Sequence, residues 1–443
     1  MQFDFNCAWQ SGPIEIRLPA HRSTWAHLKI AVDNLVFTSN APLFSDDENC
    51  EPRNFIAVSV FPLAEFIAAN WWPLLHEPQK QENLLLDASA FNQRHWIDKY
   101  TDGFAYPTLG FFGADTSVRI IAKTSRIESA NIEFPVSSGK SGAYWDGVER
   151  GAVETALLTF LTETSERLPA NDDKTWLKDV IARIRHTRID QDEAIYCRCA
   201  GLLGADPYEA GDEINAAITQ TIAILGQDVA MEMFATAEAA NVASRAQWLQ
   251  DQTHSAIRKS REVATKVDAL KRKLKVAMLP TSKPWERGYA LAQQLRNLLN
   301  LTPDMPMPTV DSVTQALFDA PSTFVSNIKN LEPNSGVRGV ASESRDGFGI
   351  AMHGGKFQLA ATFADFLFSR DDTLFLSTSA STDRQKSNRA FAAEFLAPIE
   401  GIKDKWSMNN LTETNIDNIA KEFGISSSIV SYQVQNQAES LLR

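Results

Sequence analysis

Histidine spacing is the first feature of this chain that bears on metal chemistry. A zinc-binding helix of the form His-Glu-x-x-His needs its two histidines four residues apart, because only then do both imidazoles face one side. The chain has seven histidines, and no two of them have that spacing. His76-Glu77-Pro78-Gln79-Lys80 begins correctly, but Lys80 replaces the second histidine and Pro78 breaks the helix. We therefore predict no zinc site in this segment.

Other short motifs that carry chemistry are incomplete. Ser138-Gly139-Lys140-Ser141 resembles the end of a phosphate-binding loop, but Phe134 stands at the position of its first glycine. Cys197 and Cys199 have no second cysteine or histidine pair at zinc-finger spacing, so we expect ordinary thiols. Neither G-x-S-x-G nor G-x-G-x-x-G occurs, so neither an α/β-hydrolase nor a Rossmann enzyme is indicated.

Residues 356–398 carry the most distinctive pattern in the chain. Two segments matter, Phe357-Gln358-Leu359-Ala360 and Arg389-Ala390-Phe391-Ala392-Ala393-Glu394-Phe395-Leu396-Ala397-Pro398. The stretch resembles the ImmA/IrrE family of bacterial metallopeptidases. In that family a strand leads into the His-Glu-x-x-His helix, and a second helix reading E-A-N-x-F-A-A-E-L-L-x-P follows. The resemblance implies a zincin-like α+β domain near residues 280–405.

The resemblance also identifies the positions that would carry the chemistry, and here their residues have changed. Ala361 and Asp365 stand where the two histidines would be, and Thr362 stands where the general base would be. The third, acidic ligand falls near Lys386 or Ser387. Alanine has no ligand atom, and a threonine hydroxyl is no general base at neutral pH. We therefore expect a peptidase scaffold that has lost its active site and binds no cofactor.

A rearranged zinc site is the alternative. Asp365 could coordinate a metal if His353, just before the altered helix, and a remote carboxylate such as Glu394 converged on it. The chain would then be an active metallopeptidase, which the resemblance implies would cleave a transcriptional repressor. The convergence of these three side chains distinguishes the two hypotheses.

Residues 256–279 form the most basic segment of the chain, and their pattern predicts a linker helix. Its cations are Arg258, Lys259, Arg261, Lys266, Lys271, Arg272, Lys273 and Lys275. Such a helix could contact nucleic acid or an acidic partner, with Lys271, Arg272 and Lys273 at its centre. A solvated helix between domains is the simpler interpretation.

The tail, residues 406–443, is similar to a helix-turn-helix. Ala420, Gly424 and Ile425 occupy the positions of its small residue, turn glycine and turn apolar residue. The second helix, predicted over 427–443, offers Gln433 and Gln435 to base edges but has a single arginine as its cation. We favour a packing or dimerisation element over a DNA reader.

The first 150 residues read as a mixed α/β domain. Alternating apolar residues predict strands at 3–5, 14–18, 28–32, 118–123 and 131–136, the last two as a pair. Apolar residues at helical spacing over 63–74 predict one amphipathic helix whose Trp-rich face packs on the sheet. A ligand surface is the alternative for that face.

Helical patterns dominate from residue 151 onward. Helices are predicted over 151–168, 174–185, 286–299 and 310–318, with another through Ile214, Ile218 and Ile222. A strand pair is predicted at 337–341 and 347–352, immediately before the altered zinc helix.

Composition limits the compartment and the partners. A net charge of −12 and a pI near 5.2 disfavour binding to nucleic acid or anionic membranes over the whole surface. The cysteines, Cys7, Cys50, Cys197 and Cys199, are too few for a disulfide framework. The chain opens without the pattern of a signal peptide, and its most apolar run, 58–75, is interrupted by Pro62, Glu65 and Pro73. We expect a cytoplasmic protein without a membrane segment.

These observations predict an α+β multidomain protein. Its parts are a mixed α/β domain (1–150), a helical domain (151–255), a basic linker helix (256–279), the peptidase-like domain (280–405) and the helix-turn-helix-like tail (406–443). The expected function is that of a zinc-less pseudopeptidase that binds a regulator, toxin or phage component in bacterial stress response, toxin control or phage defence. A homodimer is envisaged as well. The alternatives are an active metallopeptidase and a DNA-binding transcriptional regulator.

Overall fold

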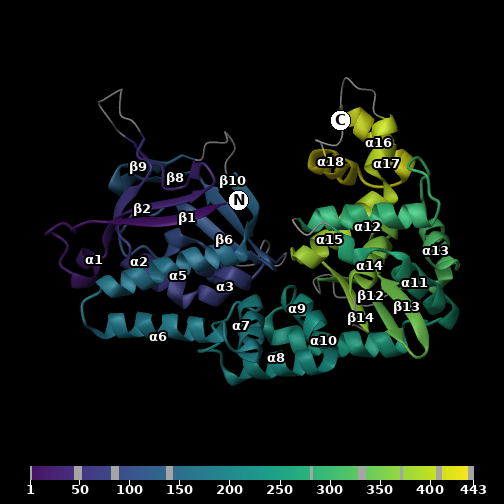
Figure 1. The fold of residues 1–443 in the computed structure, drawn as a ribbon, viewed down its shortest axis with the longest axis horizontal. Helices are drawn as coiled ribbons and strands as arrows, with labels where there is room; N and C mark the ends of the chain where they lie inside the picture. The colour runs from purple at the N-terminus through teal and green to yellow at the C-terminus, as the bar shows by residue number, and fades with distance from the viewer. Residues whose placement is uncertain are drawn as a thin grey trace. The chain divides into compact units, whose positions relative to one another are not determined.

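The computed structural model describes residues 2–43, 52–80, 89–135, 143–279, 283–327, 336–369, 373–405 and 412–437 (Figure 1). The chain divides into two compact units, Met1–Ile218 (unit 1) and Thr219–Arg443 (unit 2). Both contain helices and strands, so the predicted α+β class is confirmed at that level. The boundary falls inside helix α8, within the predicted helical segment 151–255. Cys50, Arg443 and the segment Ser138 to Ser141 lie outside the described residues.

Unit 1 contains three described antiparallel sheets. The first joins β1 (Phe3–Trp9), β2 (Trp25–Val32), β3 (Leu35–Val36) and β5 (Ile56–Ser59). The second joins β6 (Thr108–Ala114), β7 (Ser117–Lys123) and β10 (Ala143–Glu149). The third joins β4 (Ala41–Pro42), β8 (Ser125–Ile127) and β9 (Ile132–Phe134).

Several predictions for unit 1 were wrong in detail. Residues 14–18 are not a strand, and Ile14 is 87% exposed, because alternation alone supplies no partner strand and Pro13 and Pro19 flank the segment. The predicted pair at 118–123 and 131–136 corresponds to β7 and β9, which lie in different sheets. The helix predicted over 63–74 is divided by Asn70 into α2 (Phe61–Ala69) and α3 (Trp71–His76).

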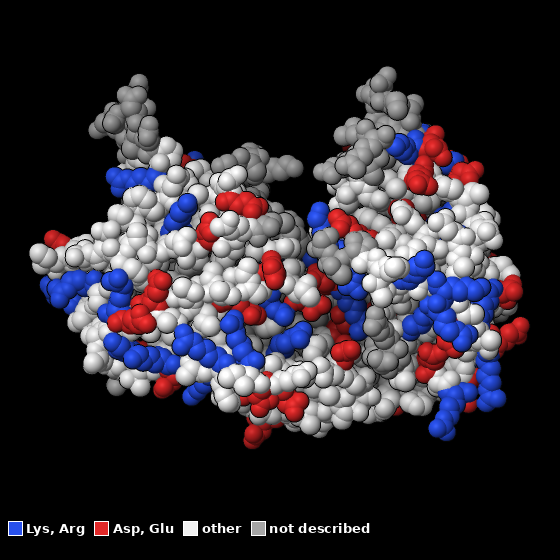
Figure 2. All heavy atoms as spheres, viewed as in Figure 1, with Lys and Arg blue, Asp and Glu red and all other residues white. Residues whose placement is uncertain are grey.

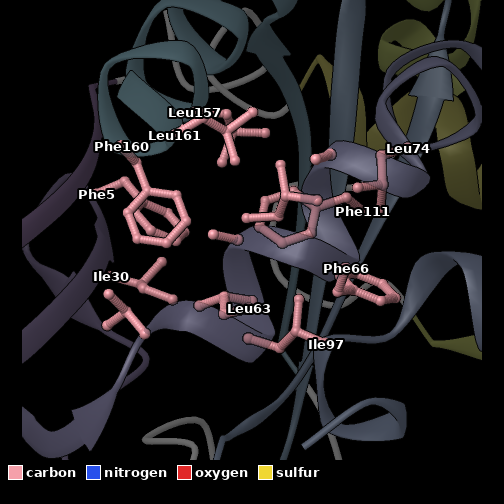
Figure 3. Packing of buried hydrophobic residues seen from close by; sticks show 14 of the residues in the cluster. Phe5, Ile30, Leu63, Phe66, Leu74, Ile97, Phe111, Leu157, Phe160 and Leu161 are labelled. Atoms are coloured by element: carbon pink, nitrogen blue, oxygen red, sulfur yellow. The ribbon is translucent and has the colours of Figure 1, made fainter. Parts of the chain in front are cut away.

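The core of unit 1 lies between its sheets and helices α2, α3 and α5 (Arg150–Arg167). Figure 3 shows Phe5, Ile30 and Leu63 converging with Phe160 and Leu161 from α5. The rings of Phe5 and Phe160 lie 4.7 Å apart. Trp71 and Trp72 are buried in the same cluster, so the core interpretation of the Trp-rich face is confirmed.

Two of the remaining helices before residue 256 were predicted: the one over 174–185 corresponds to Asp172–Thr187, and the one through Ile214, Ile218 and Ile222 corresponds to Asp212–Leu225. The order continues with α6 (Asp172–Thr187), α7 (Gln191–Leu202), α8 (Asp212–Leu225), α9 (Gln227–Phe234) and α10 (Ala239–Ser255), while α1 (Pro19–Ser23) and α4 (Ser89–His95) lie earlier. Asn171 caps α6 by accepting a hydrogen bond from the Lys174 amide. None of the described helices has the length and apolar character needed to cross a membrane.

Unit 2 is built on a sheet of order β11-β13-β12-β14. Its strands are β11 (Ser326–Asn327), β12 (Val337–Ser344), β13 (Gly347–Met352) and β14 (Leu374–Thr378). Helix α14 (Lys356–Phe368) connects β13 to β14 and packs on the sheet, while α12 (Pro284–Leu298) packs along α15 (Asp383–Leu396). The predicted strand pair and the predicted helix α13 (Val310–Phe318) are confirmed.

The basic helix is shorter than predicted and is not a linker. Residues 256–260 are not helical, and Ser260 pairs with Phe348 of β13 before α11 (Arg261–Lys273) begins. This close approach requires glycine, because a Cβ at Gly349 would lie 2.4 Å from the carbonyl oxygen of Arg258. Val263 and Val267 then join the core of unit 2, so α11 belongs to that unit's fold.

The tail contains the expected turn between two helices. Helix α16 (Ile399–Lys405) precedes α17 (Glu413–Phe423) and α18 (Ser427–Asn436). Gly424 has φ +64°, the left-handed conformation that ends a helix most readily at glycine. The described part of α18 ends at Asn436, short of the predicted residue 443.

Candidate functional site

The helix predicted from the sequence to match a zinc-binding helix is α14, and the residue on which its polar contacts converge is Asp365. The preceding glycines, Gly354 and Gly355, separate β13 from this helix. Ala361 and Asp365 occupy positions i and i+4, so they share one face as the family motif requires. Both residues are completely buried. An aspartate in such a place needs hydrogen-bond donors or an opposite charge, because burial without them is strongly unfavourable.

Asp365 obtains both from α15 and β14. Arg384 donates from Nε to Oδ1 and from Nη2 to Oδ2, each at 2.7 Å. Asn388 donates from Nδ2 to Oδ1 at 2.9 Å, and the backbone amide of Leu376 donates to Oδ2 at 2.8 Å. This is a bidentate arginine–carboxylate ion pair, and the carboxylate accepts two further hydrogen bonds. The carboxylate is therefore fully engaged by protein groups.

Local structure aligns these partners. Arg384 and Asn388 are four residues apart on α15, so they project from one helix face toward α14. Thr382 caps that helix by accepting a hydrogen bond from the Gln385 amide at 3.2 Å. Ser369, just after α14, accepts a third hydrogen bond from Arg384 at 3.1 Å. The guanidinium is thereby fixed in orientation over the carboxylate.

The residues at the zinc positions do not fit a zinc ion. Ala361 offers no donor atom, and Thr362 directs its hydroxyl to the carbonyl oxygen of Gln358 at 2.8 Å. At the third position, Lys386 pairs with Asp383 at 3.5 Å, and Ser387 donates to the Pro284 carbonyl at 2.8 Å. The Arg384 cation beside Asp365 would also repel a divalent metal.

The alternative ligands are not brought together. His353 is exposed, and its backbone amide donates to the Arg338 carbonyl oxygen at 2.8 Å. Glu394 lies ten residues beyond Arg384 on α15, about 15 Å along the helix axis. Within the described residues, no group of three or more His, Cys, Asp or Glu side chains is arranged to hold a metal ion. Asp365, His353 and Glu394 therefore form no metal centre here.

Glu394 instead anchors the tail. Its carboxylate accepts hydrogen bonds from the side-chain amides of Gln293, Gln433 and Gln437 at 3.0, 2.8 and 3.1 Å. The backbone amide of Ile399 adds a fourth at 3.2 Å. Burial raises the pKa of the Glu394 carboxyl, and these donors oppose that shift. Lys356 at the start of α14 donates to the carbonyl oxygen of Phe423 at 2.7 Å, which fixes the end of α17.

Of the residues predicted to contact nucleic acid, some are exposed and the others contact the interior of unit 2. Gln433 is buried against Glu394 and cannot reach a base edge, whereas Gln435 is exposed on the same helix. Lys271 lies with its ammonium 4.4 Å from the centre of the Phe366 ring, a cation–π contact with the core. Arg272 and Lys273 are exposed.

Unit 1 holds a buried charged cluster around Glu77, which the sequence prediction missed. Helix α3 ends at His76, as Pro78 predicts, and leaves Glu77 just beyond it. Arg94 donates to both oxygens of Glu77, at 2.9 and 3.1 Å, and His95 lies 3.0 Å from Oε2. Hydrogen bonds and charge from these partners lower the pKa of Glu77 to about 2, against the opposing effect of its burial. The cluster is a structural ion pair, and no helix was predicted over α4 (Ser89–His95), so Arg94 and His95 gave no spacing signal for it.

A second overlooked group is a hydrogen-bonded row of Ser59, His21 and Asp102. His21 Nδ1 lies 3.1 Å from Ser59 Oγ, and His21 Nε2 lies 2.9 Å from Asp102 Oδ2. These residue types form nucleophilic triads when a substrate can reach the serine. Ser59 is completely buried, and its hydroxyl lies 3.2 Å from that of Thr24, so the row ties β5 to α1.

Comparison with known proteins identified no relative: no family model, curated protein or solved structure matches this chain.

Proposed function

We propose that this chain is an ImmA/IrrE-like pseudopeptidase that acts by binding. The observation that carries the proposal is the Asp365–Arg384 pair, in which a fixed guanidinium satisfies the residue at a zinc-ligand position. A carboxylate with this set of donors has no free lone pair directed at a metal. With Ala361 and Thr362 at the other positions, this helix has no water-activating group.

The order of elements supports the same scaffold. A strand, β13, leads through two glycines into α14, and α15 follows after β14 with the apolar segment that carries the resemblance. The aromatic residues of α14 and α15 belong to the core of unit 2, so the segment retains its structural role without its ligands. Such a protein would bind a regulator, toxin or phage component in a bacterial stress response, in toxin control or in phage defence, and we place this role in the cytoplasm.

The competing functions have weaker support. A rearranged metallopeptidase requires Asp365, His353 and Glu394 to converge, and Glu394 is instead enclosed by glutamine amides. A DNA reader requires outward-facing polar residues and free cations. Gln433 of α18 instead faces Glu394 and Lys271 of α11 faces Phe366, although Gln435 of α18 is exposed. The exposed cations of α11 remain available to an acidic partner.

Elemental analysis of the purified full-length protein tests this proposal. After dialysis without chelator, we expect no stoichiometric zinc. Zinc at one ion per chain, together with proteolysis that Asp365→Ala abolishes, would overturn the proposal and restore the metallopeptidase.

A further inference from the structure

Unit 2 has an open groove between α11 and the segment that begins at the end of α13. Its volume is about 740 Å³, within the range of about 300 to 1,000 Å³ typical of ligand pockets. One wall is α11 with the residues just before it, and the other is residues 318–324. The groove is remote in sequence from Asp365 and shares no lining residue with its partners.

The α11 wall follows from the helix period. Val263, Val267 and Leu270 face the core of the unit. The opposite stripe consists of Glu262, Thr265, Lys266 and Ala269 in the groove and continues at the same spacing to Arg272 and Lys273. A segment lying in the groove would therefore have two exposed cations directly along its path.

The segment that contains this wall is basic, while the groove lining itself carries two cations, Arg258 and Lys266, against Glu262 and Asp319. Residues 258–275 contain eight basic and two acidic side chains in a chain whose net charge is −12. Figure 2 shows Lys and Arg side chains gathered over the part of unit 2 that contains α11 and α13. An acidic partner would be drawn to this region and away from most of the acidic surface.

The groove is held in shape by contacts within the unit. Arg258 donates from Nη1 to the Thr323 carbonyl oxygen at 3.3 Å, and its backbone amide donates to the Ser326 hydroxyl at 3.1 Å. Ser260 exchanges two backbone hydrogen bonds with Phe348, at 2.9 and 3.1 Å. Both walls are thus tied to the sheet, which reduces the ordering that binding would require.

The floor of the groove is apolar. Phe318 and Phe324 meet at 5.4 Å between ring centres, and Ala269, Ala320 and Pro321 extend this surface. Apolar side chains of a partner would gain from burial here, whereas phosphates would not. Two carboxylates, Glu262 and Asp319, also stand on the walls, and Asp319 lies 3.7 Å from Lys266. They repel negative charge inside the groove, so the acidic groups of a partner would lie at its edge, toward Arg272 and Lys273.

We propose that this groove binds an acidic, amphipathic segment of a protein partner. Its apolar side chains would lie on Phe318, Phe324 and Ala269, and its carboxylates would meet Arg258, Arg272 and Lys273. The inference rests on the proposed binding function and adds where the partner docks and what chemistry it presents.

Selection of short random peptides displayed on phage, against the immobilised full-length protein, tests this inference. We expect the recovered peptides to combine Asp or Glu with Leu, Ile or Phe. A fluorescein-labelled copy of one of them should bind the protein with an affinity that falls as salt rises. Peptides without acidic residues, or no recovered peptides, would overturn the proposal.

Matched variants locate the binding. We expect two charge-reversal variants, Arg258→Glu and the double variant Arg272→Glu with Lys273→Glu, each to lower the affinity for the labelled peptide by about tenfold or more. Ala269→Trp should lower this affinity as well, because the larger side chain fills the groove. Lys275→Glu makes the same single charge reversal as Arg258→Glu, on an exposed residue beyond the end of α11 and off the stripe that continues to Arg272 and Lys273, and should leave binding nearly unchanged. Circular dichroism of each variant confirms that it is folded.

The remaining outcomes are also decisive. Equal loss with Lys275→Glu would show general electrostatic attraction and contradict a specific groove. Tighter binding of a short duplex DNA than of the peptide, lost in the same variants, would assign the surface to nucleic acid instead. If peptide binding to the groove is not found and the protein binds no zinc, the pseudopeptidase proposal still stands. If the protein binds zinc and shows proteolysis, the pseudopeptidase proposal is overturned, but the groove proposal is not.

Discussion

Asp365 on α14 and Arg384 on α15 form a buried ion pair. Asp365 is completely buried, and the side chain of Arg384 is 19% exposed. A buried pair of this kind contributes little net stability over an apolar pair of similar shape. Loss of one partner is different, because the remaining charge stays buried without compensation. Replacing both residues by apolar ones should therefore change the stability of the protein little, whereas replacing only one should lower it strongly.

Removal of the Arg384 side chain should strongly destabilise the folded protein. Arg384→Ala leaves Asp365 with only Asn388 and the Leu376 amide as donors, and we expect a loss of about 3 to 5 kcal/mol in the free energy of unfolding. Urea denaturation measures it. The double variant Asp365→Leu with Arg384→Met should recover much of that loss, and Arg345→Ala, at an exposed arginine, is the control. A small effect of Arg384→Ala would mean that the pair does not form.

Glu65 on α2 gives the chain a predictable pH dependence. Burial first, and then the charges of Asp173 and Asp102, raise the pKa of Glu65 from 4.5 to about 7. The folded protein then holds this proton more tightly than the unfolded chain, so stability falls as pH rises from about 4.5 through 7. Glu65→Gln should remove this part of the decline. Denaturation at a series of pH values checks it, and parallel curves for the two proteins would contradict it.

Among the helices and strands, the sequence pattern correctly predicted those whose formation depends mainly on their own residues. The apolar spacing of α13 and the short apolar strand patterns of β12 and β13 were sufficient, because these elements pack in the core of unit 2. The strand predicted at 14–18 failed because strand pairing depends on distant residues. The break at Asn70 and the β-bridge of Ser260 likewise depend on tertiary contacts that no local pattern reveals.

The candidate site was predictable only in part. Residue spacing on α14 placed Ala361 and Asp365 together and indicated a lost zinc site. Arg384 and Asn388 were missed because their role depends on α14 facing the first turns of α15. Their i and i+4 spacing was a signal, since it puts a cation and an amide on one helix face. The glutamines around Glu394 come from two segments far apart in the sequence, Gln293 on α12 and Gln433 with Gln437 at α18, and only the i and i+4 spacing of the last two was a local signal.

The tail helices are attached to α15 by polar contacts as well as by a small apolar cluster. Gln433→Ala removes one donor from buried Glu394 and should destabilise unit 2 by about 1 to 3 kcal/mol. It should also increase hydrogen exchange in α17 and α18. Gln435→Ala, on the exposed side of the same helix, should change stability by no more than about 0.5 kcal/mol. Equal effects of the two variants would contradict this docking.

At the scale of the molecule, each unit has a core of its own. The first is centred on Leu63 and Phe160, and the second on Leu359 and Phe363. This organisation places the altered zinc helix, the groove and the tail in unit 2 and leaves the Glu77 cluster in unit 1.

Core truncations should act on their own unit. Leu63→Ala and Leu359→Ala each remove a completely buried side chain, and each should cost about 2 to 5 kcal/mol in its unit. Hydrogen exchange measured by mass spectrometry should show the loss of protection mainly within residues 2–218 for the first variant and 219–437 for the second. Uniform loss over the whole chain would mean a single cooperative core.

Arg384 satisfies the buried carboxylate of Asp365 on α14, and we propose that no metal ion takes its place. Thermal unfolding of the full-length protein, with chelator or with added zinc, tests it most directly, because any ligand of the folded state raises its unfolding temperature. We predict the same unfolding temperature in both conditions. A marked rise with zinc that the Asp365→Asn variant lacks would contradict the account, because it would show that Asp365 binds metal after all.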